Sequence, residues 1–125
     1  MSSKPRPSRS LRFTLPYPPS VNHYWRRAGQ RTLISREGRR FRRAVCAILA
    51  SERIEPLTGR LEIFIEICPP DRRRRDLDNV QKALLDALEH GGAYEDDSQI
   101  DRIVIERGEV VPSGRSRVEI RERRA

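Results

Sequence analysis

The sequence predicts an α+β fold with two layers, in which two main helices lie against one face of a mixed β-sheet. Apolar and other side chains alternate from residue 61 to residue 68, which is the strongest strand signal in the chain. Apolar residues recur at helical spacing in two other segments, residues 36–49 and 79–90. Further strands expected near both ends give the order β-α-β-α-β-β, which is typical of a two-layer domain.

The composition indicates one domain with a phosphate-rich partner. The chain has 125 residues, a common length for one domain, and a formal net charge of +8. Acidic lipid and a bias in genome base composition are alternative reasons for the charge, but no amphipathic membrane helix or lipidation motif is present, so nucleic acid is favoured. Two cysteines and two histidines without clustering argue against a zinc site. Without a signal peptide or long apolar span, we expect a cytoplasmic protein with no membrane partner and no small-molecule cofactor.

The first expected elements are a basic tail and a strand. Residues 1–10 are polar and contain two prolines, so we expect a disordered tail or arm, followed by a domain at residues 11–125. Alternation from Leu11 to Tyr17 predicts a strand, which a proline-rich segment ends. Residues 20–34 are expected to form a loop with at most one short strand.

The next expected elements are a basic helix and the central strand. The helix begins near Arg36, with Ser35 as its N-cap. Its apolar face runs from Phe41 to Leu49, and arginines cover the rest of its first turns. The strand at residues 61–67 follows and ends at a proline pair.

A second helix is expected from about Asn79 to His90. Asp78 is the predicted N-cap, because Gln81 stands three residues later and completes a capping-box pattern. The pair Gly91–Gly92 is expected to end this helix.

The remaining chain predicts two more strands. One begins near Ile100, and Val110–Val111 is a candidate extension of it. A turn at residues 112–114 then leads into a final strand around Val118.

Two acidic pairs flank the second helix. Asp76 and Asp78 would point to the same side of an extended segment, where two carboxylates can share a hard cation such as Mg²⁺. The loop after the helix would have to fold back for Asp97 to reach Asp76. Each acid has a plainer alternative role: Asp78 as a helix cap only, Asp76 as an exposed partner of Arg75, and Asp96–Asp97 as part of a turn.

A lysine and an asparagine accompany the first acidic pair. Lys82 lies one helical turn after Asp78, where its charge can neutralise a phosphate, although a surface ion pair with Asp86 or Asp78 is the alternative. Asn79 can orient a ligand or hold a carboxylate. These residues follow a run of four arginines, and together the pattern favours a metal-dependent enzyme that acts on nucleic acid.

The most specific motifs are DRRRRDLDNVQKALLDAL, then a glycine turn and an aromatic residue, then DDSQI. Together with LPYPPSVNHYWR and ISREGRRFR, these motifs resemble the RusA-type crossover junction endodeoxyribonucleases over roughly residues 11–120. The resemblance implies a RusA-like fold and a homodimeric, Mg²⁺-dependent resolvase of four-way Holliday junctions, with Mn²⁺ as an alternative ion. It also implies paired symmetric nicks with 5′-phosphate and 3′-hydroxyl ends.

The same resemblance assigns roles to individual residues. The implied catalytic residues are Asp76, Asp78, Asp97 and Lys82. The implied metal ligands are Asp76, Asp78 and Asp97, with Asp96 as the other member of its pair and Asn79 in support. The expected DNA contacts are the arginines Arg72, Arg73, Arg74, Arg75, Arg36, Arg39, Arg40 and Arg43. Glu95 departs from the family pattern, which often has an apolar residue at that position.

Two rival functions stay open at this point, a non-catalytic basic binding module and a metal nuclease for flaps or single strands. Phe13, Tyr24 and Trp25 are candidates for wedging between bases, although plain packing is favoured for Phe13. The dimer surface is unassigned, with the strand at residues 61–67 and the helix from Arg36 as candidates.

Overall fold

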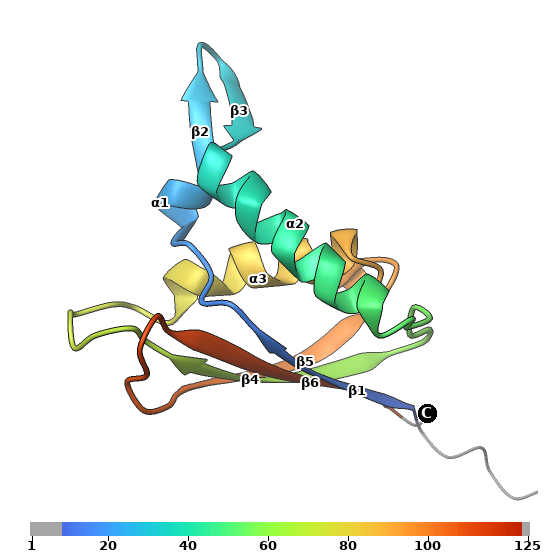
Figure 1. Ribbon diagram of the computed structural model, residues 1–125. Coiled ribbons are helices and arrows are strands. Elements are labelled where there is room, and N and C mark those ends of the chain that lie inside the picture. The colour runs from blue at the N-terminus through green and yellow to red at the C-terminus, as the bar shows by residue number, and fades with distance from the viewer. Residues whose placement is uncertain (1–8, 124–125) are drawn as a thin grey trace, which may run out of the picture.

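The computed structural model describes residues 9–123, which form a four-stranded mixed sheet with helices over one face (Figure 1). The strands of this sheet pair in the order β1-β6-β4-β5, and only β4 and β5 are parallel. The strands are β1 (Ser10–Leu15), β4 (Leu61–Cys68), β5 (Ile100–Arg107) and β6 (Arg115–Glu122). The predicted α+β class with a mixed sheet is therefore confirmed.

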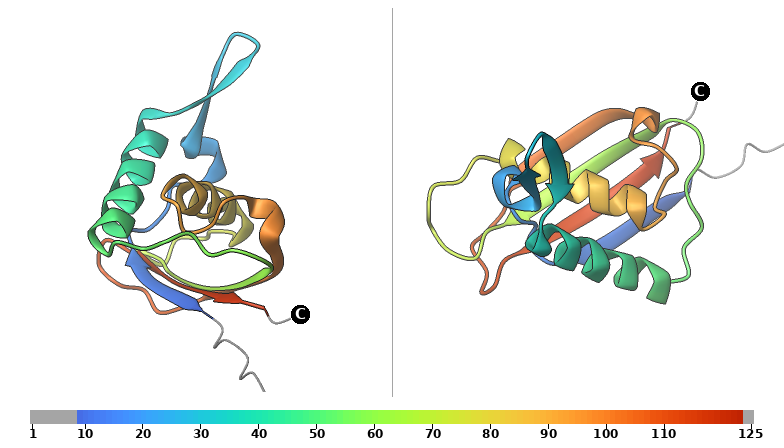
Figure 2. Two further views of the ribbon diagram at one scale, coloured as in Figure 1. Left: turned by 90° about the vertical axis from the view of Figure 1, so that its right-hand side faces the viewer. Right: turned by 90° about the horizontal axis from the view of Figure 1, so that it is seen from above.

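Two long helices form the second layer. The helices are α2 (Arg36–Ser51) and α3 (Asp78–His90), and two further views show both lying across the same face of the sheet (Figure 2). Apolar positions one turn apart on each helix are buried against the inner face of the sheet. The core side chains with no exposed surface include Val45, Leu49, Leu61, Ile63, Leu84, Leu88 and Ile120. Burial of these side chains is the main favourable contribution to folding.

Two predicted boundaries near the helices hold in the structure. The Ser35 hydroxyl accepts a hydrogen bond from the Gly38 backbone N–H at 2.9 Å, so Ser35 caps α2 as expected. Gly91 caps the end of α3, and Gly92 follows with a φ of +83° that favours glycine. Both signals depend only on residues next to the helix end, which is why the sequence alone located the start of α2 and the end of α3.

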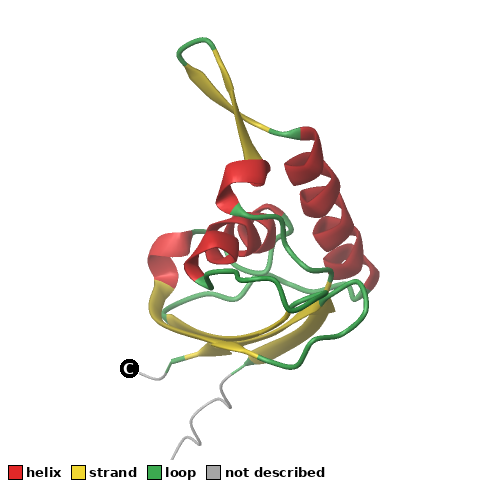
Figure 3. Ribbon diagram, turned by 90° about the vertical axis from the view of Figure 1, so that its left-hand side faces the viewer, coloured by secondary structure: helices red, strands yellow, loops and turns green. Residues whose placement is uncertain are grey.

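The segment at residues 20–34 is more ordered than expected. It forms a short helix, α1 (Val21–Tyr24), and a hairpin of β2 (Trp25–Ala28) and β3 (Arg31–Ile34) that projects from the body (Figures 1 and 3). The prediction of a loop was wrong. The hairpin turn has two central residues, and Gly29 at the first has a φ of +65°, as a type II′ turn requires.

One expectation near the sheet needs correction, and another lies mostly outside the described residues. Val110–Val111 does not extend β5, which ends at Arg107; the Val111 backbone N–H instead donates to the Pro69 carbonyl at 3.0 Å. The expected tail at residues 1–10 lies outside the described residues except at its end, where Ser10 begins β1 and the Arg9 carbonyl accepts from Glu122 at 3.0 Å. Within residues 9–123, no helix combines the length and apolar character that a membrane span requires.

Candidate active site

The loop between β4 and α3 is organised by Asp71. One oxygen of its carboxylate accepts hydrogen bonds from the Arg73 backbone N–H at 2.9 Å and from Arg75 Nη1 at 2.6 Å. The hydrogen bond from Arg75 is the main reason that the pKa of Asp71 falls from 3.8 to about 2. The Arg75 guanidinium also lies 5.8 Å from the centre of the Tyr17 ring. Of the four arginines at positions 72–75, Arg75 therefore folds inward and shapes the loop.

The start of α3 leaves the Asp78 carboxylate unused by the helix. Asp78 is the first helical residue, and Leu77 before it already has helical dihedral angles (φ −62°, ψ −36°) with no side-chain capping bond. The predicted N-cap role of Asp78 was therefore wrong, and Asp76 and Asp78 do not lie on one extended segment, because Leu77 between them is helical. A negative charge in the first turn is still favoured by the helix dipole. Lys82 lies one turn further along the helix, and its side chain is exposed like that of Asp78.

A groove of about 840 Å³ brings arginines of both predicted sets together with Asp76, one member of the first acidic pair. It lies between the proline-rich segment at residues 16–20, helix α2 and the segment at residues 70–80. Asp76 and Asn79 line it together with Arg40 from α2. The arginines contributed by the loop are Arg73, Arg74 and Arg75. The carboxylate of Asp76 thus shares one hollow with cationic groups that can hold a phosphate.

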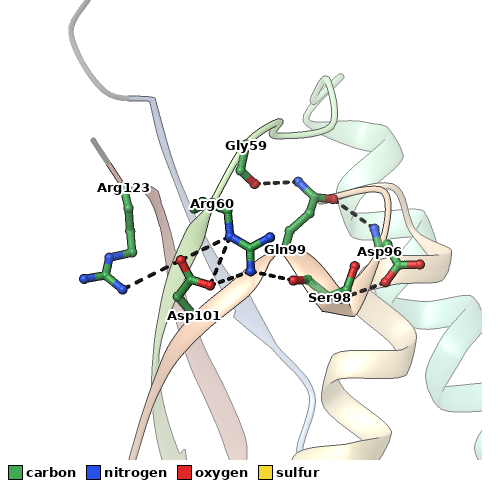
Figure 4. A network of polar contacts seen from close by, with 7 residues as sticks. All are labelled: Gly59, Arg60, Asp96, Ser98, Gln99, Asp101 and Arg123. Atoms are coloured by element: carbon green, nitrogen blue, oxygen red, sulfur yellow. Dashed lines mark hydrogen bonds and ion pairs between the residues drawn. The ribbon is translucent and has the colours of Figure 1, made fainter. Parts of the chain in front are cut away.

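Asp96 and Asp97 have separate structural settings after α3. The Asp96 carboxylate accepts a hydrogen bond from the Ser98 backbone N–H at 2.7 Å and caps the short helix η1 (Asp97–Gln99). Gln99 completes the capping box by accepting from the Asp96 backbone N–H at 2.9 Å, and it also donates to the Gly59 carbonyl (Figure 4). The turn that the sequence offered as an alternative role for Asp96 and Asp97 is therefore present.

Asp97 is placed by Tyr94. The buried Tyr94 hydroxyl lies 2.8 Å from Asp97 Oδ1 and 2.9 Å from the Leu85 carbonyl, which sets Asp97 beside the C-terminal half of α3. Burial, followed by the charges of Asp97 and Asp96, raises the pKa of Glu89. Glu95 is exposed, and only its backbone N–H makes a hydrogen bond, to Gln99. The structure gives no role to the Glu95 side chain.

The two acidic pairs do not form one cluster. Among residues 9–123, no group of three or more histidine, cysteine, aspartate or glutamate side chains is placed to hold a metal ion. The exposed carboxylates of Asp76 and Asp78 nevertheless have the oxygen donors that Mg²⁺ prefers. The four-carboxylate metal set from the sequence stays a prediction.

The aromatic residues considered as wedges occupy the interior or pack beside it. Phe13 and Tyr24 are 4% and 0% exposed, so packing is the role of both, and wedging by either is excluded without a rearrangement. Trp25 is half-buried and packs edge-on against Tyr24, with ring centres 5.0 Å apart. Asp71 was not predicted to shape the site, although its position four residues before Arg75 indicated an ion pair.

Known proteins match this chain over most of its length. A family model described as "Endodeoxyribonuclease RusA" matches residues 16–122. The protein named "Crossover junction endodeoxyribonuclease rusA" of Enterobacteria phage HK97 is 48% identical over 111 residues, which cover 88% of this chain and 92% of the relative. Proteins with the same name from Escherichia coli K12 and Enterobacteria phage 82 are 42% and 43% identical over the same shares of both chains.

Proposed function

The chain belongs to the RusA family of endodeoxyribonucleases, and we propose that it resolves four-way DNA junctions by paired, symmetric cuts in recombination and repair. Relatives named as crossover junction endodeoxyribonucleases support the choice of a branched substrate. The observation that carries the proposal is the groove in which Asp76 and Asn79 lie among arginines from two separate segments. A groove with both signs of charge suits an anionic backbone that must be bound and then cut.

The proposed cofactor is Mg²⁺, with Mn²⁺ as an alternative ion. Asp76 and Asp78 would hold it, and Asp97, supported by Asp96, would complete the set by approaching them, because the two acidic pairs do not form one cluster in the described part of the structure. When bound, such an ion polarises a phosphodiester and lowers the pKa of a water molecule that attacks it. The oxygen-only donor set fits this ion, because hard divalent cations prefer carboxylates, water and phosphate.

The remaining side chains of the site would position the DNA. Lys82, one turn after Asp78, would place its ammonium group where negative charge grows on the phosphate oxygens. Asn79 lines the groove beside Asp76 and would hold a carboxylate or a phosphate oxygen by hydrogen bonds. Exposed arginines that would contact phosphates outside the reacting bond are Arg36, Arg39, Arg40, Arg43, Arg72, Arg73 and Arg74.

A homodimer is the proposed active assembly. A four-way junction offers two strands related by symmetry, so a two-fold pair of sites would cut both. We propose that the products carry a 5′-phosphate and a 3′-hydroxyl, as in the family that the motifs resemble. Ends of this kind can be rejoined by a ligase without further processing.

The decisive experiment compares cleavage of four-way, flap and linear DNA, in Mg²⁺ and in EDTA. The proposal expects paired symmetric cuts in the four-way junction alone, and only with the metal. The variant Asp78→Asn should still bind the junction in a gel-shift assay but should not cut it, because the ligand is lost while the arginines remain. Binding of the junction without any cutting by the natural protein would favour a non-catalytic module. Cutting of flaps instead would favour the other rival.

A further inference from the structure

The hairpin of β2 and β3 carries three arginines that the site does not use. Arg26, Arg27 and Arg31 are exposed, and residues 20–36 contain no acidic residue. None of the three forms an ion pair with a carboxylate in the described part of the chain. The hairpin, which projects from the body on the side opposite the sheet (Figures 1 and 3), therefore carries three positive charges that no carboxylate in the described residues neutralises.

The register of the hairpin separates these arginines onto two faces. Arg26 pairs with Leu33 and Ala28 pairs with Arg31, so Arg26 and Arg31 share one face. Arg27 lies on the other face with Trp25 and Ile34, which are half-buried at the base. Both faces of the hairpin thus carry arginines near its tip, whereas apolar side chains pack only at its base.

The base of the hairpin is tightly fixed to both long helices. The buried Tyr24 hydroxyl donates a hydrogen bond to the Asp86 carboxylate on α3, which also accepts from Arg42 Nη2 on α2 at 2.7 Å. The Ser35 backbone N–H donates to the Tyr24 carbonyl at 2.8 Å. A Cβ on Gly38 would collide with that carbonyl oxygen, so glycine permits the close approach of α2 to the hairpin base.

We propose that the β2–β3 hairpin is a DNA-binding arm that contacts backbone phosphates of a duplex arm of the junction. This inference rests on the proposed junction substrate and extends its contacts beyond the groove. A two-stranded ribbon fits the major groove of B-DNA, and arginines on both ribbon faces would meet phosphates on its two edges. Helix α2 begins two residues after β3, so its exposed arginines continue the same positive surface towards the groove.

The test is the salt dependence of junction binding by the triple variant Arg26→Ala/Arg27→Ala/Arg31→Ala, made in the full chain carrying Asp78→Asn to prevent cutting. The matched control removes three exposed arginines that are paired with glutamates on the sheet, namely Arg12→Ala/Arg102→Ala/Arg117→Ala. Loss of three phosphate contacts should make the logarithmic salt slope shallower by about 2.7 and weaken binding about tenfold or more, whereas the control should leave the slope unchanged. An unchanged slope in the hairpin variant would overturn the inference.

A second variant tests whether the position of the hairpin matters in addition to its charge. Tyr24→Phe keeps every arginine but removes the hydrogen bond to Asp86, so it should weaken junction binding severalfold while leaving linear-duplex binding less affected. Circular dichroism and light scattering establish that each variant is folded and retains its oligomeric state. A hairpin variant that changes the oligomeric state with unchanged junction affinity would identify a contact between copies and contradict the arm. If the Asp78→Asn parent itself does not bind four-way DNA, the proposed function fails; if it binds and the hairpin variants match it, only the arm fails.

Discussion

The outer face of the sheet and the groove side both carry many arginines, but their partners differ. On the outer face, arginines pair with glutamates of the same or a neighbouring strand, as in the 2.8 Å contact of Arg121 with Glu119 and the 3.7 Å contact of Arg102 with Glu62. Arg102 and Arg121 also stack on Phe64, at 5.7 and 4.8 Å from the ring centre. Among residues 9–123, no ion pair involves the exposed arginines Arg36, Arg39, Arg40, Arg43, Arg72 and Arg74.

This difference teaches that the pairing of arginines, rather than their number, indicates a phosphate-binding surface. Each exposed ion pair contributes about 0–1 kcal/mol to stability, so pairing hardly decides the fold. It does cancel the local field, whereas unpaired arginines on the groove side attract a polyanion. The six unpaired arginines named above therefore concentrate positive charge on the groove side of the molecule.

The variant with the largest expected effect tests whether the groove side takes part in cleavage as well as in DNA binding. Lys82→Ala should lower the rate of junction cleavage by about 10²–10³-fold, the scale for removing one preorganised charge from a transition state. Junction affinity should change little, because only one of many cations is lost. The measurement is single-turnover cleavage, with Lys82→Arg as the matched variant that keeps the charge. Equal loss of binding and cleavage in Lys82→Ala would reduce this lysine to a simple phosphate contact.

The next effect tests the contrast between the two arginine surfaces directly. The triple variant Arg40→Ala/Arg72→Ala/Arg74→Ala removes three unpaired arginines of the groove side and should make the salt slope of junction binding shallower by about 2.7. The sheet triple Arg12→Ala/Arg102→Ala/Arg117→Ala removes the same formal charge and should leave that slope unchanged. Similar losses in both variants would mean that total charge, not its pairing, governs binding.

The smallest effect sharpens the distinction within the arginine run itself. Because Arg75 is paired with Asp71, the carboxyl signal of Asp71 in an NMR titration should have its midpoint at about 2 rather than 3.8. Since the folded pKa is the lower one, this pair contributes stability above pH 3.8 and loses it as the pH falls towards 2. Arg75→Gln should return the midpoint towards 3.8. A midpoint of 3.8 for Asp71 in the unsubstituted protein would show that Arg75 is not paired with it.

The sequence predicted the elements whose signals are strong and local. The alternation in β4 and the apolar face of α2 each span several turns or residue pairs, so tertiary context did not override them. The hairpin was missed because each strand has only four residues and its alternating positions include arginines on both faces. Its one clear signal was the glycine at the first position of a two-residue turn.

The candidate site was only partly predictable for a different reason. Asp78 resembles a cap in sequence, but a cap needs extended backbone and Leu77 before it is already helical. The place of Asp97 depends on Tyr94 packing against α3, a long-range contact that spacing cannot reveal. The groove likewise joins segments far apart in the chain, so the meeting of Arg40 with Asp76 came only from the fold.

The side-chain Nε–Hε NMR signals of the arginines, followed as four-way DNA is added to Asp78→Asn, test directly whether the unpaired arginines hold the DNA. Pairing should divide these signals into two groups. The signals of the unpaired Arg40, Arg72 and Arg74 should shift or broaden on binding, whereas those of Arg102 and Arg121 on the outer face should stay in place. Shifts confined to the outer-face arginines, with the groove signals unchanged, would contradict the account.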